Sequence, residues 1–433
     1  MKFFQVFILI CWFATSTVMC RAQNNTGRDT LLILIQEHYD HGRFEEAINL
    51  CGKVIEADST DIETLMLRGI MYDFTNAYEA ALKDYTTVLQ IDPMNVDARM
   101  NRPMIWNELM EYDSAMADYN FMLKHGMADD EVLLAQAFNL YDSGNWYEAV
   151  NAVNNAIEFD STYAPAFLMR ASIWDEIGEY RLAVFDYEKF KLIGQPNQYQ
   201  YLSIGVCKVN AGMYAQAQPD LEMCMKLGGD STYACYELGR SCIGLEEFKK
   251  AMQWLQVSVR HNPEFADAHA QLGIAYRRLG ETNKAIEAFK TSIDINESVD
   301  VIFEMALALW DDEQIDEALK LVTVAIENNT LHIAEAYCLR GRCHAEKEQY
   351  AKAILDYTMS LDHIPGHITT LQMRAEAYEL KADKHADNKG KKEARIGYEL
   401  ALADLYQIES IEMNSNGTAK SIERIEKKLK RLD

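Results

Sequence analysis

An alanine recurs every 34 residues through most of this 433-residue chain. The interval repeats seven times in succession, at Ala47, Ala81, Ala115, Ala149, Ala183, Ala217, Ala251 and Ala285. The register then slips by one residue to Ala318, recovers at Ala353, and resumes at Ala401 after the insertion KADKHADNKGKKEARIG. A period kept over so many copies predicts a repeat architecture, in which each copy buries its apolar face mainly against its neighbours.

Residue size at the other positions of the repeat predicts two antiparallel helices per copy. With the alanine numbered as position 20, position 8 is Gly or Ala in most repeats, and positions 11, 17 and 24 are usually large or aromatic. Small residues let the helices approach, and glycine at position 15 ends the first of them. Pro103, at position 8 of the third repeat, predicts a tolerated kink, and Pro219 predicts a shifted or bent start of its helix.

This pattern resembles the tetratricopeptide repeat, and AHAQLGIAYRRLGETNKAIEAFKTSIDINES is similar to the family consensus. The resemblance extends over about residues 28–410. It implies an all-α fold, a right-handed α-solenoid of about ten to eleven helix-turn-helix repeats, whose first helices line a concave groove. We predict an array over 28–366 and an atypical final repeat with a charged insertion over 367–410. A basic amphipathic helix over 417–433 then caps the last repeat, or touches the acidic groove or another protein.

The first 22 residues have the features of a secretory signal peptide. Lys2 precedes an apolar run from Phe3 to Met19, and the small residues Cys20 and Ala22 precede a cleavage site before Gln23. We therefore expect an exported protein, periplasmic or secreted. The alternatives are a lipoprotein or a chain anchored in the membrane by this segment, and we expect no membrane-spanning segment after its removal.

The charge of the chain restricts its partners. The whole chain carries a net charge of −25, and residues 23–380 contain 28 basic and 57 acidic residues. Such an acidic surface repels nucleic acids and anionic membranes and attracts basic partners.

Five repeats combine arginine at position 7 with aspartate at position 23. The pairs are Arg68 and Asp84, Arg102 and Asp118, Arg170 and Asp186, Arg340 and Asp356, and Arg374 and Asp404. Only one of the six other repeats has aspartate at position 23, where Asp220 accompanies Ile204. We interpret the pairs as half-buried ion pairs that fix the register of the two helices of one repeat. The alternative is an arginine row that recognises phosphate or carboxylate.

In repeats of this family the side chains at positions 5, 9 and 12 commonly face the concave side. The predicted partner-binding groove consists of Met66, Ile70, Met100, Met104, Leu134, Phe138, Leu168, Val206, Tyr236 and Arg240. The Lys, Asn and Arg set with which related co-chaperones hold an acidic tail is missing. An apolar, methionine-containing groove in an acidic array favours a partner protein or peptide with basic and apolar residues. Alternatively, neighbouring repeats or the chain termini cover these side chains.

The sequence contains no recognisable catalytic motif. It lacks a Gly-rich phosphate loop, HExxH and GxSxG, so we expect no enzyme, no cofactor and no metal site. The cysteines after the leader are expected to be buried thiols, with Cys224 and Cys235 as the pair that could approach in an oxidising compartment.

Two functions fit these observations. The first is a non-catalytic scaffold or assembly factor in an exported compartment, which binds a partner segment in the concave groove. The second is a holdase-type co-chaperone of unfolded chains in a secretory lumen, without a J domain because no His-Pro-Asp tripeptide occurs.

Overall fold

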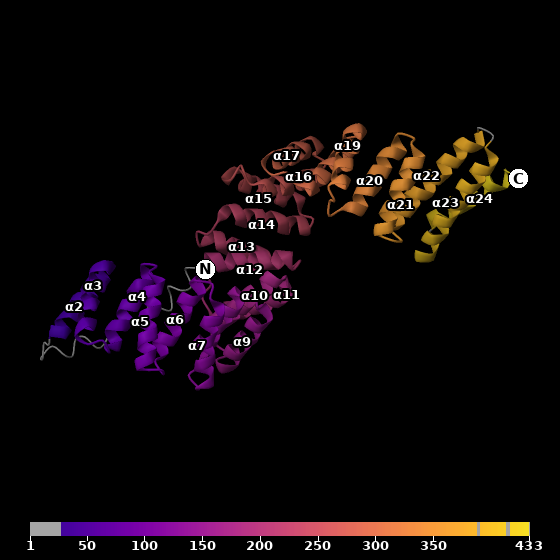
Figure 1. Ribbon diagram of the computed structural model, residues 1–433. Helices are drawn as coiled ribbons and strands as arrows, with labels where there is room; N and C mark the ends of the chain where they lie inside the picture. The colour runs from indigo at the N-terminus through magenta and orange to yellow at the C-terminus, as the bar shows by residue number, and fades with distance from the viewer. Residues whose placement is uncertain (1–26, 388–389, 413–415, 433) are drawn as a thin grey trace. The chain divides into compact units, whose positions relative to one another are not determined.

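A computed structural model describes residues 27–387, 390–412 and 416–432. The predicted signal peptide, residues 1–22, lies outside the described residues. Regular structure within the described residues is entirely helical, with 23 helices that form eleven hairpins and one additional C-terminal helix (Figure 1). The predicted all-α class is therefore confirmed.

Each hairpin consists of a first and a second helix. The first helices are α2 (Gly27–Asp40), α4 (Ile62–Phe74), α6 (Val96–Glu108), α8 (Asp130–Asp142), α10 (Ala164–Ile177), α12 (Gln198–Asn210), α14 (Ser231–Gly244), α16 (Ala266–Arg278), α18 (Val299–Asp311), α20 (Ile333–Glu346) and α22 (Ile368–Asp387). The second helices are α3 (Phe44–Ala57), α5 (Tyr78–Ile91), α7 (Tyr112–Lys124), α9 (Trp146–Phe159), α11 (Tyr180–Ile193), α13 (Tyr214–Lys226), α15 (Phe248–His261), α17 (Thr282–Ile295), α19 (Ile315–Glu327), α21 (Tyr350–His363) and α23 (Lys391–Ile411). The last helix is α24 (Asn416–Lys430).

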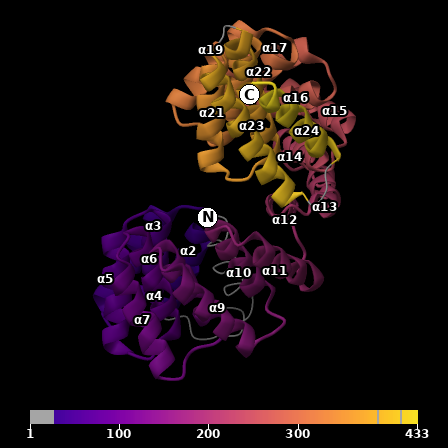
Figure 2. The same ribbon diagram turned by 90° about the vertical axis from the view of Figure 1, so that its right-hand side faces the viewer.

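The chain divides after Gln195 into two compact bodies, which we describe separately. The N-terminal body contains α2 to α11, and the C-terminal body contains α12 to α24. Within each body every hairpin packs on the next one along the chain. Figure 2 shows the hairpins of the N-terminal body in a second view.

The repeating alanine lies at the centre of each hairpin. All eleven position-20 alanines are fully buried. The small residue at position 8 is required by the aromatic ring at position 24: a Cβ on Gly69 would lie 2.7 Å from the ring of Tyr85, and one on Gly273 would lie 2.6 Å from that of Phe289. These close contacts explain why residue size repeats with the period of the array.

Both unusual prolines lie inside continuous helices. Pro103 is buried within α6, which runs from Val96 to Glu108. The predicted shift of the helix start at Pro219 is wrong, because α13 begins at Tyr214, at the same repeat position as α11 and α15. Proline removes only one backbone donor, so a helix that packs on both neighbours tolerates it.

The charged insertion lengthens the last hairpin. The helices α22 and α23 have 20 and 21 residues, whereas every other first or second helix has 13 or 14. The extra residues therefore extend both helices of the pair, apart from residues 388–389, which are not described.

The helix α24 covers the end of the array, as predicted for a cap. Ile422 and Ile425 pack into the core cluster of the last hairpin. Two of its basic side chains pair with α22, where the buried Glu379 accepts hydrogen bonds from Arg424 at 2.7 Å and pairs with Lys428 at 2.8 Å. The cap thus satisfies both the apolar and the charged groups at the end of the array.

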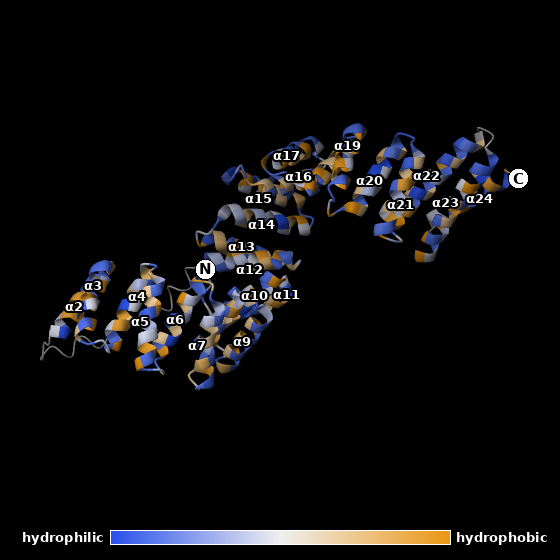
Figure 3. Ribbon diagram, viewed as in Figure 1, coloured by the Kyte–Doolittle hydropathy of each residue, from blue (hydrophilic) through white to orange (hydrophobic). Residues whose placement is uncertain are grey.

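Polar and apolar residues are interleaved along the helices of both bodies (Figure 3). Within the described residues we find no helix that combines the length and the apolar character needed to cross a bilayer.

Candidate functional site

The first helices line the inner face of each body. Within each body, consecutive first helices contact one another directly, for example α4 with α6 and α6 with α8. Among the described residues, contacts between consecutive second helices are sparse or missing. Because the first helices lie closer together, their side of the stack is the concave one, and a partner that follows the array meets it there.

The structure brings together all five arginine and aspartate pairs. In each pair the arginine donates from Nε and Nη2 to both carboxylate oxygens, with Nη2–O distances of 2.7 Å for Arg68–Asp84, Arg102–Asp118, Arg170–Asp186 and Arg374–Asp404 and 2.6 Å for Arg340–Asp356. The aspartates are buried and the guanidinium groups are about one fifth exposed. They lie between the two helices of one repeat, and this placement supports a structural role over anion capture.

Three of these arginines also reach the preceding repeat. The donor Nη1 is 3.2 Å from Thr86 Oγ1 for Arg102, 2.5 Å from Asn154 Oδ1 for Arg170, and 3.1 Å from Thr358 Oγ1 for Arg374. Each acceptor sits at position 25 of the preceding second helix. A polar residue at that position permits this three-helix contact but does not ensure it, since Thr323 holds the same position before Arg340 and donates to the backbone oxygen of Leu319 instead.

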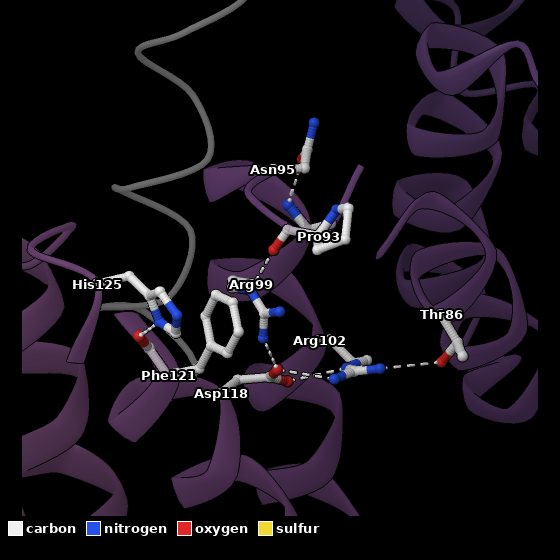
Figure 4. Close-up of polar contacts among 9 residues, drawn as sticks. Thr86, Pro93, Asn95, Arg99, Arg102, Asp118, Phe121 and His125 are labelled. Atoms are coloured by element: carbon white, nitrogen blue, oxygen red, sulfur yellow. Dashed lines mark hydrogen bonds and ion pairs between the residues drawn. The ribbon is translucent and has the colours of Figure 1, made fainter. Parts of the chain in front are cut away.

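Two further cations pair with position-23 aspartates. Arg99 replaces the usual apolar residue at position 4 and donates to Asp118 at 2.9 Å and to the backbone oxygen of Pro93 at 2.8 Å. Figure 4 shows its guanidinium over the ring of Phe121, with 3.3 Å between Cζ and the ring centroid. Lys208, one turn after Ile204, forms a buried ion pair with Asp220. Asp220 therefore also has a cation within its own repeat.

The predicted groove residues differ in exposure. The structure buries four of them, namely Met66, Ile70, Leu134 and Tyr236. For these four the expected availability to a partner is corrected, because each packs into a core cluster of its own and neighbouring helices. Partly exposed are Met100, Met104, Phe138, Leu168, Val206 and Arg240. Of these, Val206 and Arg240 belong to the C-terminal body.

A row of carboxylates runs along the inner face of the N-terminal body. Asp73, Glu108, Asp142 and Glu176, which we call the acidic row, lie at or next to the C-terminal ends of α4, α6, α8 and α10. These four helices have no basic residue in their last turn. Among the described residues no lysine or arginine forms an ion pair with any member of the row. Negative charge at a helix C-terminus is unfavourable, so the row is an electrostatic cost to the folded chain.

The pKa values of two members of the row, Asp73 and Asp142, reflect the same cost. Desolvation, followed by the charge of Glu108, raises the pKa of Asp73 to about 6. The same two causes, in the same order, raise the pKa of Asp142. The pKa of Tyr141 is raised mainly by desolvation and secondly by the charges of Glu176 and Asp142. The members of the row therefore interact across successive helices, and a cation placed beside them would relieve the repulsion.

The inner face of the C-terminal body is different. Its first helices contribute arginines that already have acidic partners: Arg240 contacts Glu237 at 2.9 Å, and Arg277 contacts Glu304 at 3.2 Å. Tyr236 stacks with Phe265 at 4.8 Å between ring centroids. At these places the acidic and basic side chains of the inner face are already paired with each other.

The cysteines of the described residues are free thiols, most of them buried. The seven cysteines after residue 26 are free, and six of them are buried. Burial raises the pKa of the thiols of Cys224 and Cys235, so they are poor nucleophiles. In the same part of the chain, no group of three or more His, Cys, Asp or Glu side chains is arranged to hold a metal ion.

The stacked hairpins define a helical repeat protein, and comparisons identify the repeat. Family models described as tetratricopeptide repeat match residues 266–298 and 303–367. The remaining hairpins keep the same period and the same buried alanine. The chain is therefore a tetratricopeptide-repeat protein.

Solved structures with similar helical arrays include the TPR domain of P58(IPK), with 17% identity, coverage of 83% of this chain and 99% of that chain, and a TM-score of 0.40. YrrB, a TPR protein with an unusual peptide-binding site, has 21% identity, covers 45% of this chain and 97% of its own, and has a TM-score of 0.39. Human IFIT1 has 14% identity, coverage of 82% and 94%, and a TM-score of 0.42. No curated protein matches the chain in sequence.

Proposed function

We propose that the chain is a non-catalytic scaffold or assembly factor that binds a segment of a partner protein on the inner face of its N-terminal body. The repeat family supports the general role of a protein-interaction scaffold. The acidic row carries the more specific part of the proposal. Four unpaired carboxylates at helix C-termini destabilise the free protein, and a cationic segment offsets that cost on binding.

Apolar side chains beside the row supply anchors for the same segment. Three partly exposed side chains lie on the same first helices that carry the row: Met100 and Met104 on α6, and Leu168 on α10. Methionine adapts its shape to different apolar partners, so this surface favours apolar anchors without demanding one residue type. The proposed partner segment therefore combines apolar residues with lysine or arginine.

The repeat spacing restricts where the basic residues stand. Packed helices lie roughly 8–10 Å apart, and an extended chain advances about 3.3 Å per residue. A segment in the polyproline II conformation has three residues per turn and rises about 3.1 Å per residue, so basic residues at every third position would lie on one side and meet successive carboxylates of the row. Four carboxylates correspond to a segment of about ten residues.

We further propose that the protein works in an exported compartment, together with envelope or secretion proteins. This part rests on Lys2, the apolar run that follows it and the small residues before Gln23. It is independent of the binding surface, and the N-terminus of the mature protein tests it separately.

Binding of synthetic peptides to the mature protein tests the proposal. The probe is a fluorescent ten-residue peptide with lysine at every third position and Leu or Met between, measured by anisotropy. We expect saturable binding that weakens as salt rises, mainly through the association rate. The variant Glu108→Gln with Asp142→Asn should weaken binding about tenfold, from two lost charge contacts of roughly 0.5–1 kcal/mol each.

A matched control removes two acidic residues from second helices of the same body. The variant Glu56→Gln with Glu158→Gln changes the net charge equally, and both positions are exposed. It should retain the affinity of the unmodified protein. Equal loss in both variants would mean that only the overall charge attracts the peptide, and the row would have no specific role.

The holdase alternative predicts a different result with the same probes. A holdase binds apolar segments largely irrespective of the spacing of their charges, so a peptide with the same composition and scrambled lysines would bind equally well. Strong preference for the regular peptide supports the scaffold.

A further inference from the structure

The outer face of the N-terminal body carries an exposed apolar pair on α11. Leu182 and Phe185 are 47% and 59% exposed. They occupy positions 19 and 22 of the repeat, where the other repeats have polar or small residues at one or both positions. No other repeat has large apolar residues at both positions, so the periodic pattern of the array does not account for this pair.

The pair forms one wall of a hollow between α9 and α11. The hollow has a volume of about 310 Å³, and Trp174 contributes a second apolar surface. Its polar lining consists of Asn154, Arg170 and Asp186. This space accommodates one large side chain, and its exposed apolar walls would gain from being covered.

The guanidinium of Arg170 in this hollow has N–H donors that are not used in hydrogen bonds within the described residues. Arg170 uses Nε and Nη2 for Asp186 and one N–H of Nη1 for Asn154. A guanidinium has five N–H groups, so two of them have no partner among the described residues. They provide a polar contact for a hydrogen-bond acceptor that enters the hollow.

Two exposed basic residues flank the pair on α11. Arg181 lies one turn before Phe185, and Lys189 lies one turn after it, with its Nζ 5.9 Å from the ring centroid. Both are exposed. The nearby Glu188 pairs with Lys191 at 3.4 Å. In an array that is otherwise strongly acidic, this rim favours carboxylates.

We propose that the hollow is a second docking site, which takes an aromatic anchor side chain from a partner segment with acidic residues beside it. The apolar walls bind the ring, Arg170 offers its free N–H groups to an acceptor, and Arg181 and Lys189 attract the flanking carboxylates. The site is lined by α9, α10 and α11 and selects the opposite charge from the acidic row, so it does not depend on the function proposed for the inner face.

Fluorine NMR of the mature protein labelled with 5-fluorotryptophan tests this site. Trp174 is part of the hollow, and its resonance is assigned with a Trp174→Phe variant. The probes are the acetylated, amidated pentapeptides Asp-Glu-Phe-Glu-Asp, Lys-Arg-Phe-Arg-Lys and Asp-Glu-Ala-Glu-Asp. We expect the first peptide to shift the Trp174 resonance saturably at millimolar concentration and to bind about tenfold more tightly than the other two.

Two variants separate the site from nonspecific binding. Leu182→Ser with Phe185→Ser should abolish the shift, whereas the matched control Phe159→Ser with Leu355→Ser, two residues that are each 62% exposed, should retain it. Arg181→Glu with Lys189→Glu should reverse the preference between acidic and basic peptides. The proposal is overturned if no peptide moves the Trp174 resonance, if the Leu182 and Phe185 variant responds like the unmodified protein, or if acidic and basic peptides bind equally.

Discussion

Replacement of Asp118 by asparagine should destabilise the third hairpin more than the equivalent change in any repeat with a single arginine. Asp118 is 1% exposed and accepts three charge-assisted hydrogen bonds, from Arg99 at 2.9 Å and from Arg102 at 2.8 and 2.7 Å. The substitution leaves two guanidinium groups beside a neutral amide (Figure 4). A buried charge that loses its partner costs about 3–5 kcal/mol.

Neighbouring substitutions set the scale for this cost. Asp84 binds only Arg68, whose side chain is about one fifth exposed and can be hydrated when the carboxylate is lost. We therefore expect Asp84→Asn to cost about 2 kcal/mol and Asp118→Asn about 4 kcal/mol. Arg99→Leu should cost less than about 1 kcal/mol, since Leu65 and Leu133 occupy the same position in adjacent repeats and are buried. In the Arg99→Leu background, Asp118→Asn should be milder by about 1–2 kcal/mol, because one stranded charge is gone.

Native-state hydrogen exchange read by mass spectrometry measures these costs locally. A repeat array does not unfold in one step, so the opening free energy of residues 96–124 is a better measure than a single melting temperature. The expected order of cost is Asp118→Asn, then Asp84→Asn in its own hairpin, then Arg99→Leu. If Asp118→Asn costs no more than Asp84→Asn, or if Arg99→Leu costs about 3 kcal/mol or more, then the cluster is not held together as described.

Three other predictions concern the row, the cap and the leader. In the folded protein the pKa of Asp73 is about 6, above its unfolded value, so the charged carboxylate destabilises the fold above pH 6 and this destabilisation fades as the pH falls towards 4. The variant Asp73→Asn should therefore stabilise α4 by about 1–2 kcal/mol at pH 7 and by nearly nothing at pH 4. Hydrogen exchange at the two pH values measures the difference. Truncation after Glu412 removes Ile422 and Ile425 from the last core cluster, and exchange in residues 368–411 should accelerate while the N-terminal body is unaffected. Intact mass should show a mature chain that begins at Gln23; a mass that includes Met1 or a lipid on Cys20 would rule out simple export.

The fold was largely predictable because residue size repeats with the period of the hairpins. An alanine at position 20 and a small residue opposite an aromatic at position 24 report directly on the distance between two helices, as Gly69 and Tyr85 do. The acidic partner of the position-7 arginines was also predictable, since arginine at position 7 and aspartate at position 23 occur together in the same repeats.

Features that depend on a single repeat were harder to predict. Arg99 stands where neighbouring repeats have leucine, and only the structure places it over Phe121 and beside Asp118. Lys208 likewise supplies the cation from a different position of its helix. Met66 and Leu134 were assigned to the groove by position alone, but the same residue types at the same position, Met100 and Leu168, are partly exposed, so local packing and not residue type decides exposure.

The acidic row escaped the sequence analysis for a related reason. Carboxylates at helix ends are usually solvated, and repulsion between them becomes visible only when successive helices are side by side. Comparison of positions 12 and 13 across repeats would have found the row, since Asp73, Glu108, Asp142 and Glu176 stand there in four consecutive repeats.

The most direct test of the account is site-specific photo-crosslinking of the mature protein in its native extract. A benzoylphenylalanine at Met104, on the inner face, is compared with one at Lys83, which is exposed on the second helix α5. We predict one predominant adduct from position 104, with lysine or arginine close to an apolar residue in the crosslinked peptide, and none from position 83. An adduct from position 83 alone, or a broad mixture of unrelated chains from position 104, would contradict the claim that the inner face of the N-terminal body binds a specific basic segment.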